Sequence, residues 1–165
     1  MTPGGHVRTA ALGALLAAGA VLWFRRHYLV ATVRGRSMEP TYREGDQLLV
    51  RRAARPRAGQ VVVVRAPDPP LAYEPDGPLT PEEANAPEIE PPPADRLLVK
   101  RAVAVAGDPV PRDDFPALRD TAEPVVPPGS LVVLGDNPSV SWDSREYGFV
   151  RPTDYVGVVL RRLTG

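Results

Sequence analysis

Two side chains of this sequence stand out as partners for covalent catalysis, Ser37 and Lys100. Of the 20 basic residues, 19 are arginine, and Lys100 is the single lysine. An arginine keeps its proton in a protein, whereas a desolvated lysine can lose its proton and then act as a general base. Such a base can activate a serine hydroxyl for attack on a carbonyl carbon. The sequence therefore offers a serine–lysine pair, with chance as the alternative explanation for the single lysine.

The positions of both residues suit this chemistry. Ser37 lies in the segment Gly35–Thr41 directly after a predicted strand, where a nucleophile is exposed and held by a rigid scaffold. Lys100 lies within another predicted strand on the face of Leu98 and Ala102, where burial would lower its pKa. A fall of about three pH units costs about 4 kcal/mol but gives a useful neutral fraction at pH 7. The alternatives are an ordinary turn serine and a surface lysine on an edge strand.

The composition excludes most other catalytic centres. The chain has no cysteine, which excludes disulfides, thiolate metal sites and cysteine nucleophiles. Both histidines, His6 and His27, precede Tyr28, so the region after them has no Ser-His-Asp triad and no histidine-based zinc site. A base in that region has to be lysine, aspartate or glutamate. We therefore expect neither a metal nor another cofactor.

The region before Tyr28 predicts a membrane anchor. The run Thr9–Phe24 carries no charge and would span roughly 24 Å as a helix. The hydrocarbon core is ~30 Å thick, and flanking arginines and aromatic residues could cover the difference. The alternatives are a signal peptide cleaved after Ala18–Ala20 and a buried core helix. Arg25 and Arg26 conflict with an extracytoplasmic domain, because the positive-inside rule would keep the residues after them in the cytoplasm.

After residues 1–27, the chain reads as one mainly β domain over residues 28–165. Short β-branched runs are bounded by Gly, Pro or Asp, and no helical periodicity of useful length follows the anchor. We therefore expect a compact barrel-like or sandwich core. The predicted strands are Leu29–Val33, Gln47–Arg51, Gln60–Arg65, Arg96–Val105, Leu131–Leu134 and Val156–Arg162.

An acidic, proline-rich insertion interrupts this domain at residues 66–95. It holds ten of the 21 prolines, eight of the 20 acidic residues and no basic residue. It can bury little apolar surface, so we expect an extended or disordered loop. The rest of the chain carries a basic excess, which favours membrane lipid as a partner. Nucleic acid is not expected as a partner, because no basic stripe with interleaved aromatic residues is present.

Four segments resemble the type I signal peptidase family of serine–lysine proteases, and they occur in that family's order. Arg36–Thr41 resembles its nucleophile box, and Gly45–Val50 resembles the strand that follows. Lys100–Asp108 resembles its lysine box. Residues 135–145 and Gly148 resemble its signature segment GDN-x-x-x-S-x-D-S-R. Together with the predicted anchor, these segments cover most of the chain outside the insertion.

The resemblance implies a role for each matching residue. Ser37 would attack the scissile carbonyl, Lys100 would take its proton, and Ser141 would hydrogen-bond and orient the lysine amine. Asp143 and Arg145 would form a supporting ion pair. The other implied site residues are Gly35 and Met38 beside the nucleophile, Leu98 and Val99 along the substrate, and Gly135, Asp136, Asn137 and Ser144 in the signature segment.

The resemblance also implies a substrate, the signal peptide of an exported preprotein. It would add as a strand between the residues before Ser37 and the segment Leu97–Lys100, with small residues at positions −1 and −3 of the cleavage site. The backbone N–H of Ser37 would donate to the oxyanion. Some relatives have an assisting serine where this sequence has Gly35, so that side-chain donor is missing here. The enzyme would sit in the cell membrane with an extracytoplasmic catalytic domain.

Three other functions stay open from the residues alone. A specialised processing protease of the same chemistry would act on one dedicated substrate. A repressor-type autoprotease would share the serine and lysine strands, but it needs a DNA-binding domain and its own cleavage site, and we expect neither before Ser37. A β binding module on a membrane stalk would have no need of Ser37, Lys100 and Ser141 together.

Overall fold

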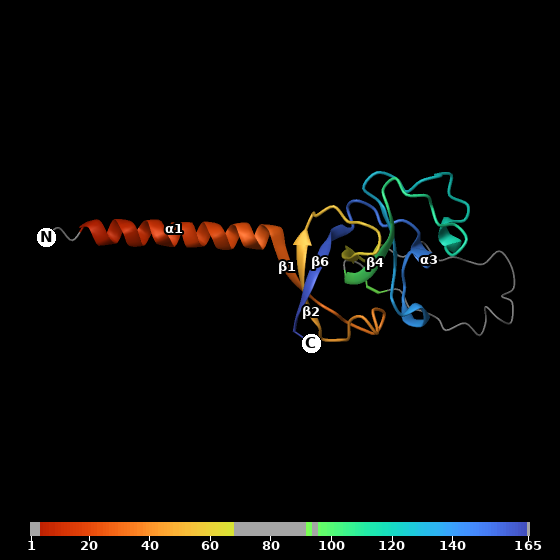
Figure 1. Ribbon diagram of the computed structural model, residues 1–165, viewed down its shortest axis with the longest axis horizontal. Helices are drawn as coiled ribbons and strands as arrows, with labels where there is room; N and C mark the ends of the chain where they lie inside the picture. The colour runs from red at the N-terminus through yellow and green to blue at the C-terminus, as the bar shows by residue number, and fades with distance from the viewer. Residues whose placement is uncertain (1–3, 68–91, 94–95, 165) are drawn as a thin grey trace.

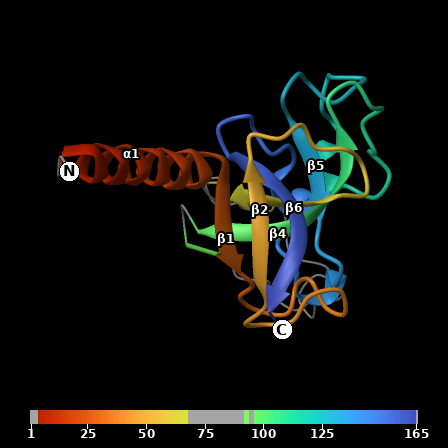
Figure 2. The same cartoon turned by 60° about the vertical axis from the view of Figure 1, so that its left-hand side comes forward.

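A computed structural model of the chain describes residues 4–67, 92–93 and 96–164. One long helix, α1 (Gly4–His27), extends away from a β domain and leads directly into its first strand (Figures 1 and 2). The expected transmembrane span is not confirmed: within the described part of the chain, no helix is both long and apolar enough to cross a membrane. Most of the predicted insertion at residues 66–95 lies outside the described residues, so its conformation stays a prediction.

Six strands form one sheet in which every neighbouring pair is antiparallel, in the order β1-β2-β6-β3-β4-β5. The mainly β fold is confirmed, as one sheet rather than the two sheets of a sandwich. Each predicted strand agrees with an observed strand to within two residues at either end. The strands are β1 (Tyr28–Thr32), β2 (Gln47–Arg52), β3 (Val61–Arg65), β4 (Leu97–Val105), β5 (Leu131–Leu134) and β6 (Tyr155–Thr164).

The central strand β3 explains how one sheet makes a core. Its four valines, Val61–Val64, are all buried. Val61 and Val63 pack in one cluster with Leu48, whereas Val62 and Val64 pack in a second cluster with Val133. A strand with both faces buried reads as a continuous apolar run. The sheet is strongly twisted, so that β4 runs nearly across the direction of β1 and β2 (Figure 2), and both faces of β3 are covered.

The twist leaves an open edge on β4. On one side β3 pairs with residues 97–101, but on the other side β5 pairs only from Arg101 onward. Among the described residues, the first four residues of β4 therefore have no strand partner on that edge. The chain that follows β1 lies near this edge, because Val33 and Arg34 line a small pocket together with the start of β4. This pocket lies in a slot between the end of β1 and the start of β4.

Three short helical turns complete the fold: η1 (Pro116–Leu118), η2 (Pro138–Val140) and α3 (Ser144–Tyr147). None of them was predicted from the sequence, because a single turn is too short to show a helical period. η1 contributes Leu118 to a third apolar cluster with Phe115 and Val132 under the loop after β4. η2 and α3 belong to the signature segment and lie at the candidate site.

Gly157 in β6 marks a close approach between strands, and replacing it should cost stability. A Cβ atom here would lie 2.2 Å from the carbonyl oxygen of Arg51, a backbone atom that cannot move alone. We expect Gly157→Ala to lower the free energy of unfolding by about 2–3 kcal/mol in denaturant titrations, as overpacking does. Gly19→Ala is the control, since no atom lies within 4 Å of a Cβ there. Equal stability of the two variants would contradict the strand packing described here.

Candidate active site

Lys100 points inward from β4 and is only 2% exposed. It lies on the face of the strand that carries Leu98 and Ala102, which pack in the second apolar cluster. Burial lowers the pKa of Lys100 from 10.5 to about 8, although the charges of Asp143 and Glu146 partly oppose this effect. About a tenth of the molecules therefore carry a neutral amine here at pH 7.

Ser141 receives the lysine amine. The Nζ of Lys100 donates to the Oγ of Ser141 over 2.7 Å, and that Oγ donates to the Oδ2 of Asp143 over 2.6 Å. A hydroxyl has one proton, and because Ser141 gives it to the carboxylate, it can only accept from the lysine. The amine thus uses an N–H bond on this contact. Its lone pair, once the amine is neutral, stays free to take a proton from another group.

Asp143 is completely buried and anchors this series of hydrogen bonds. Its two oxygens accept from the Nε and Nη2 of Arg145, each over 3.0 Å, and Oδ2 also accepts from the backbone N–H of Gly135 over 2.9 Å. A buried carboxylate is costly unless it is paired and hydrogen-bonded, and these contacts meet that need. The structure therefore contains the ion pair that the sequence predicted between Asp143 and Arg145.

The short helix α3 fixes where Asp143 points. Asp143 is its N-cap and accepts from the backbone N–H of Arg145, while the Glu146 carboxylate accepts from the backbone N–H of Asp143 over 2.7 Å. This reciprocal pair is a capping box, which satisfies donors that a helix start leaves free. Ser144 adds a link to β5, because its Oγ accepts from the backbone N–H of Val133 over 2.9 Å.

Ser37 lies half-buried in the turn after β1, against the start of the signature segment. Its carbonyl oxygen accepts from the backbone N–H of Asn137 over 2.9 Å. Gly135 passes so close that a Cβ on it would lie 2.2 Å from the Oγ of Ser141 and 2.6 Å from the carbonyl oxygen of Ser37. Only glycine fits at such distances, so the absence of a side chain at Gly135 lets the serine turn and the lysine partner meet.

Two pockets meet at Ser37. One has a volume of about 20 Å³ and is formed mainly by apolar residues that include Val33, Met38 and Val99. The other has a volume of about 170 Å³ and contains Lys100. The structure thus brings the predicted residues Ser37 and Lys100 to one cavity. It also places the predicted residues Met38, Leu98 and Val99 beside that cavity, with Leu98 shared by both pockets.

Gly35 has a φ of +78°, which is the left-handed region that favours glycine. A Cβ there would meet no atom within 4 Å, so space is available but the backbone conformation is strained for any other residue. The absence of a side-chain oxyanion donor at position 35 therefore follows from the backbone conformation as well as from the residue type.

An ion pair that the sequence analysis missed links three of the predicted segments. Arg101 donates to both carboxylate oxygens of Asp136, over 2.8 and 2.6 Å, and Thr41 donates to the same carboxylate. Burial alone would raise the pKa of Asp136, but the hydrogen bonds from Arg101 and Thr41 outweigh it and lower that pKa. The sequence feature that could have indicated this ion pair is the position of Arg101 directly after Lys100. Side chains alternate along a strand, so Arg101 has to point to the face opposite Lys100.

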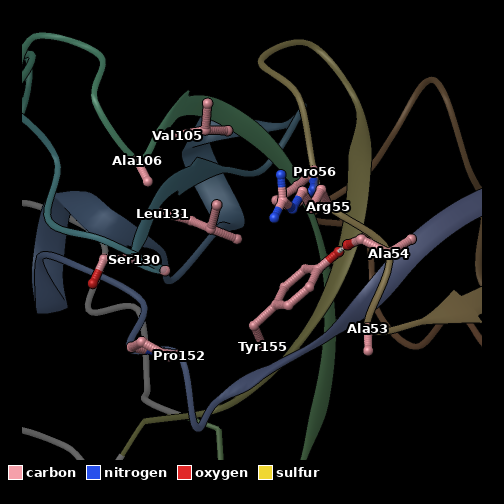
Figure 3. Close-up of a pocket in the computed structure, with 11 residues that line it drawn as sticks. Ala53, Ala54, Arg55, Pro56, Val105, Ala106, Ser130, Leu131, Pro152 and Tyr155 are labelled. Carbon is pink, nitrogen blue, oxygen red and sulfur yellow. Dashed lines mark hydrogen bonds between the residues drawn. The ribbon is translucent and has the colours of Figure 1, made fainter.

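A larger cavity, of about 550 Å³, has no lining residue in common with the pocket of Ser37 and Lys100. Arg55 and Pro56 lie on one side of it and Leu131 and Val105 on the other, with Tyr155 below them in this view (Figure 3). This cavity is therefore separate from the candidate active site. Nor do the described residues include a group of three or more histidine, aspartate or glutamate side chains placed to hold a metal ion.

Comparison with known proteins agrees with this geometry. A family model described as signal peptidase, peptidase S26, matches residues 7–116 and 111–163. The chain belongs to this family. It is similar to the signal peptidase I V of Bacillus subtilis strain 168, with 28% identity over 140 residues, which cover 77% of this chain and 80% of that protein. It is also similar to the signal peptidase I of Bacillus caldolyticus, with 50% identity over 46 residues.

That second match covers 28% of this chain and spans only a quarter (25%) of the relative's length. Membership of the signal peptidase family confirms the resemblance seen in the sequence. It also implies that the chain is a hydrolase of the protease class. The individual roles of the site residues stay predictions.

The burial of Lys100 predicts a pH-dependent cost to stability. Between pH 8 and 10.5 the unfolded chain binds more protons at this lysine than the folded chain, so the free energy of unfolding rises with pH there. Below pH 8 the full cost, about 3 kcal/mol, is present. We expect Lys100→Met to gain stability relative to the wild type at pH 7, and this gain should shrink by about 2–3 kcal/mol at pH 10.

Denaturant unfolding at both pH values measures this difference. Arg96→Met is the control, because Arg96 is an exposed cation directly before the same strand. A difference between Lys100→Met and the wild type that does not change with pH would mean that Lys100 stays charged in the folded protein.

Proposed function

We propose that this chain is a serine endopeptidase that removes signal peptides from exported preproteins through a Ser37–Lys100 dyad. The observation that carries the proposal is the buried Lys100 amine, which donates to Ser141 and borders the same pocket as Ser37. Family membership supports the reaction class. The names of both relatives, signal peptidase I and signal peptidase I V, support the substrate class.

In the proposed reaction, the neutral amine of Lys100 takes the proton of the Ser37 hydroxyl as its oxygen attacks the scissile carbonyl. The resulting ammonium then gives a proton to the leaving amine, so one group acts first as base and then as acid. Ser141 keeps the amine directed at Ser37, because its own proton is committed to Asp143. The backbone N–H of Ser37 donates to the oxyanion, and Gly35 adds no side-chain donor.

The slot between β1 and β4 supports an extended substrate. A peptide that pairs with the open edge at residues 97–100 would alternate its side chains between the two faces of β4. The residue at −1 would enter the pocket of about 20 Å³ formed by Val33, Met38 and Val99. This volume is little more than the ~10–15 Å³ that one water molecule needs, which favours alanine or another small residue.

A binding module without catalysis is disfavoured on energetic grounds. Desolvation of Lys100 costs about 3 kcal/mol, and a module that only binds peptides gains nothing from this cost. Groups with strongly shifted pKa values inside clefts are typical of catalytic sites. A specialised protease with one dedicated substrate uses the same dyad, so it differs from a general signal peptidase in substrate range alone.

Cleavage of a peptide with alanine at −1 and −3, assayed in detergent, tests the dyad. Ser37→Ala and Lys100→Arg should both be inactive, since an arginine keeps its charge but cannot accept a proton. Ser141→Ala should lose about 10–100-fold in kcat, because it orients the base without transferring a proton. The effects of Ser37→Ala and Lys100→Ala should be far from additive.

For the wild type, kcat/KM should rise about tenfold from pH 7 to above pH 9, through an apparent pKa near 8.

Unfolding curves and circular dichroism establish whether each variant is folded. A folded Lys100→Arg that retains substantial activity would remove Lys100 as the base. A folded and active Ser37→Ala would remove the nucleophile and with it the proposed reaction.

We further propose that α1 attaches the protein to the cell membrane as a single-pass anchor, with the catalytic domain outside the cytoplasm. Signal peptidases are typically membrane-associated, which supports the attachment. α1 ends in a basic turn, Arg25–His27, that suits an interface with anionic lipid. Large apolar side chains are exposed along the second half of the helix, at Leu16, Val21, Leu22, Trp23 and Phe24.

The anchor proposal predicts that the full chain sediments with membranes and resists carbonate extraction. A chain that begins at Tyr28 should be at least partly soluble, because it lacks the exposed apolar side chains of α1. Recovery of a mature chain that begins at Val21 would instead support a cleaved signal peptide. Protease digestion of intact cells decides the orientation: an extracytoplasmic domain is degraded, whereas a cytoplasmic domain, as Arg25 and Arg26 favour, is protected.

A further inference from the structure

The pocket of about 170 Å³ beside Ser37 has a marked charge imbalance. Besides Lys100, three arginines line it: Arg34 and Arg36 from the turn after β1, and Arg96 at the start of β4. Among the residues that the structure describes, no aspartate or glutamate lines this pocket. Its other walls are mostly apolar and include Leu98, Val140 and Trp142.

Among the described residues, two of these arginines have no carboxylate partner. Arg36 forms an ion pair with Glu39, with 3.0 Å between the Nε and Oε2 atoms, so its charge is largely balanced. Within the described part of the chain, neither Arg34 nor Arg96 forms an ion pair or a side-chain hydrogen bond. Both are exposed at the mouth of this cavity, so an anionic group placed there gains two favourable charge interactions.

The position of Lys100 indicates which part of a substrate reaches this pocket. The leaving amine must lie next to the group that protonates it, so the residue after the scissile bond lies on the Lys100 side. Side chains alternate along an extended peptide, and the pocket of Val33, Met38 and Val99 takes the −1 side chain on the opposite face of β4. The +1 side chain therefore points to the face of Lys100 and Trp142.

We propose, on the basis of the proposed function, that Arg34 and Arg96 select substrates with a glutamate at position +1. The glutamate methylenes lie against Trp142 and Leu98, and its carboxylate reaches the two guanidinium groups at the mouth. The volume supports this choice, since about 170 Å³ accepts a longer side chain than the pocket of about 20 Å³ at −1. The preferred mature chains thus begin with an acidic residue.

The test compares four peptides with alanine at −1 and −3, which carry either glutamate or its neutral isostere glutamine at +1 or at −2. At low salt, the wild type should cleave the +1 glutamate peptide with about fivefold higher kcat/KM than the +1 glutamine peptide. This factor corresponds to about 1 kcal/mol, the upper value for exposed ion pairs. The factor should fall as salt is raised, because the arginines are exposed.

Charge-removing variants assign the effect to residues. In Arg34→Gln combined with Arg96→Gln, the ratio of glutamate to glutamine cleavage at +1 should fall to about one. Arg55→Gln, which removes an exposed arginine from the separate larger cavity, is the matched control and should keep the wild-type ratio. A ratio of one in the wild type, a ratio that survives in the double variant, or a glutamate preference at −2 alone would each overturn the proposal.

Binding to Ser37→Ala separates this proposal from the proposed function. Fluorescence anisotropy of labelled peptides measures affinity without turnover, and the +1 glutamate peptide should bind about fivefold more tightly than its glutamine counterpart. If the wild type cleaves no peptide but this preference is present, the peptidase proposal fails and the pocket assignment stands. If the wild type cleaves both peptides equally and Ser37→Ala binds them equally, the pocket assignment fails and the peptidase proposal stands.

Discussion

The burial of Lys100 is the constraint on which the rest of this structure depends. A lysine that is 2% exposed is stable in the fold only when its amine is neutral or when neighbouring groups offset its positive charge. In this protein, neighbouring groups offset that charge in part. The Ser141 hydroxyl accepts from the amine, and the buried Asp143 carboxylate stands one hydrogen bond further away. Because the carboxylate does not contact the amine directly, it raises the pKa less than desolvation lowers it. The result is a pKa of about 8, close to the range in which a general base works.

The compensation in turn requires the signature segment to be held tightly. Asp143 is neutralised by Arg145 and fixed as the N-cap of a single helical turn, α3. Gly135 then brings this segment within contact of the Ser37 turn, at a spacing that excludes any side chain. On the other face of β4, Arg101 and Asp136 connect the lysine strand to the same segment. The contacts of Gly135 with the Ser37 turn and of Arg101 with Asp136 join parts of the chain that are far apart in the sequence, so the site forms only when the sheet has formed.

The open edge of β4 connects this chemistry to substrate recognition. A slot with an unpaired backbone edge accepts any extended peptide, so the backbone provides binding without strong sequence preference. Selectivity then has to come from the two pockets at Ser37. One is small and formed mainly by apolar residues, and the other is larger, with more arginines at its mouth. Their difference in volume and charge gives the two sides of the scissile bond different requirements.

Local sequence patterns determined the strands of this protein. Short β-branched runs between turn residues gave six strands within two residues of their observed ends, because strand formation follows from local alternation and turn chemistry. The long helix before residue 28 was visible for the same reason. The single lysine and the absence of histidine after residue 28 also limited the candidate base, since this limit depends on composition and not on geometry.

The tertiary structure decided what local patterns cannot encode. Whether the strands form one sheet or two depends on long-range pairing, and here β6 inserts between β2 and β3 in a single twisted sheet. The Arg101–Asp136 ion pair and the meeting of Arg34 and Arg96 at one pocket both depend on contacts between distant segments. The sequence determined which residues could do chemistry, and only the fold determined their burial and neighbours, because desolvation and charge pairing act through space rather than along the chain.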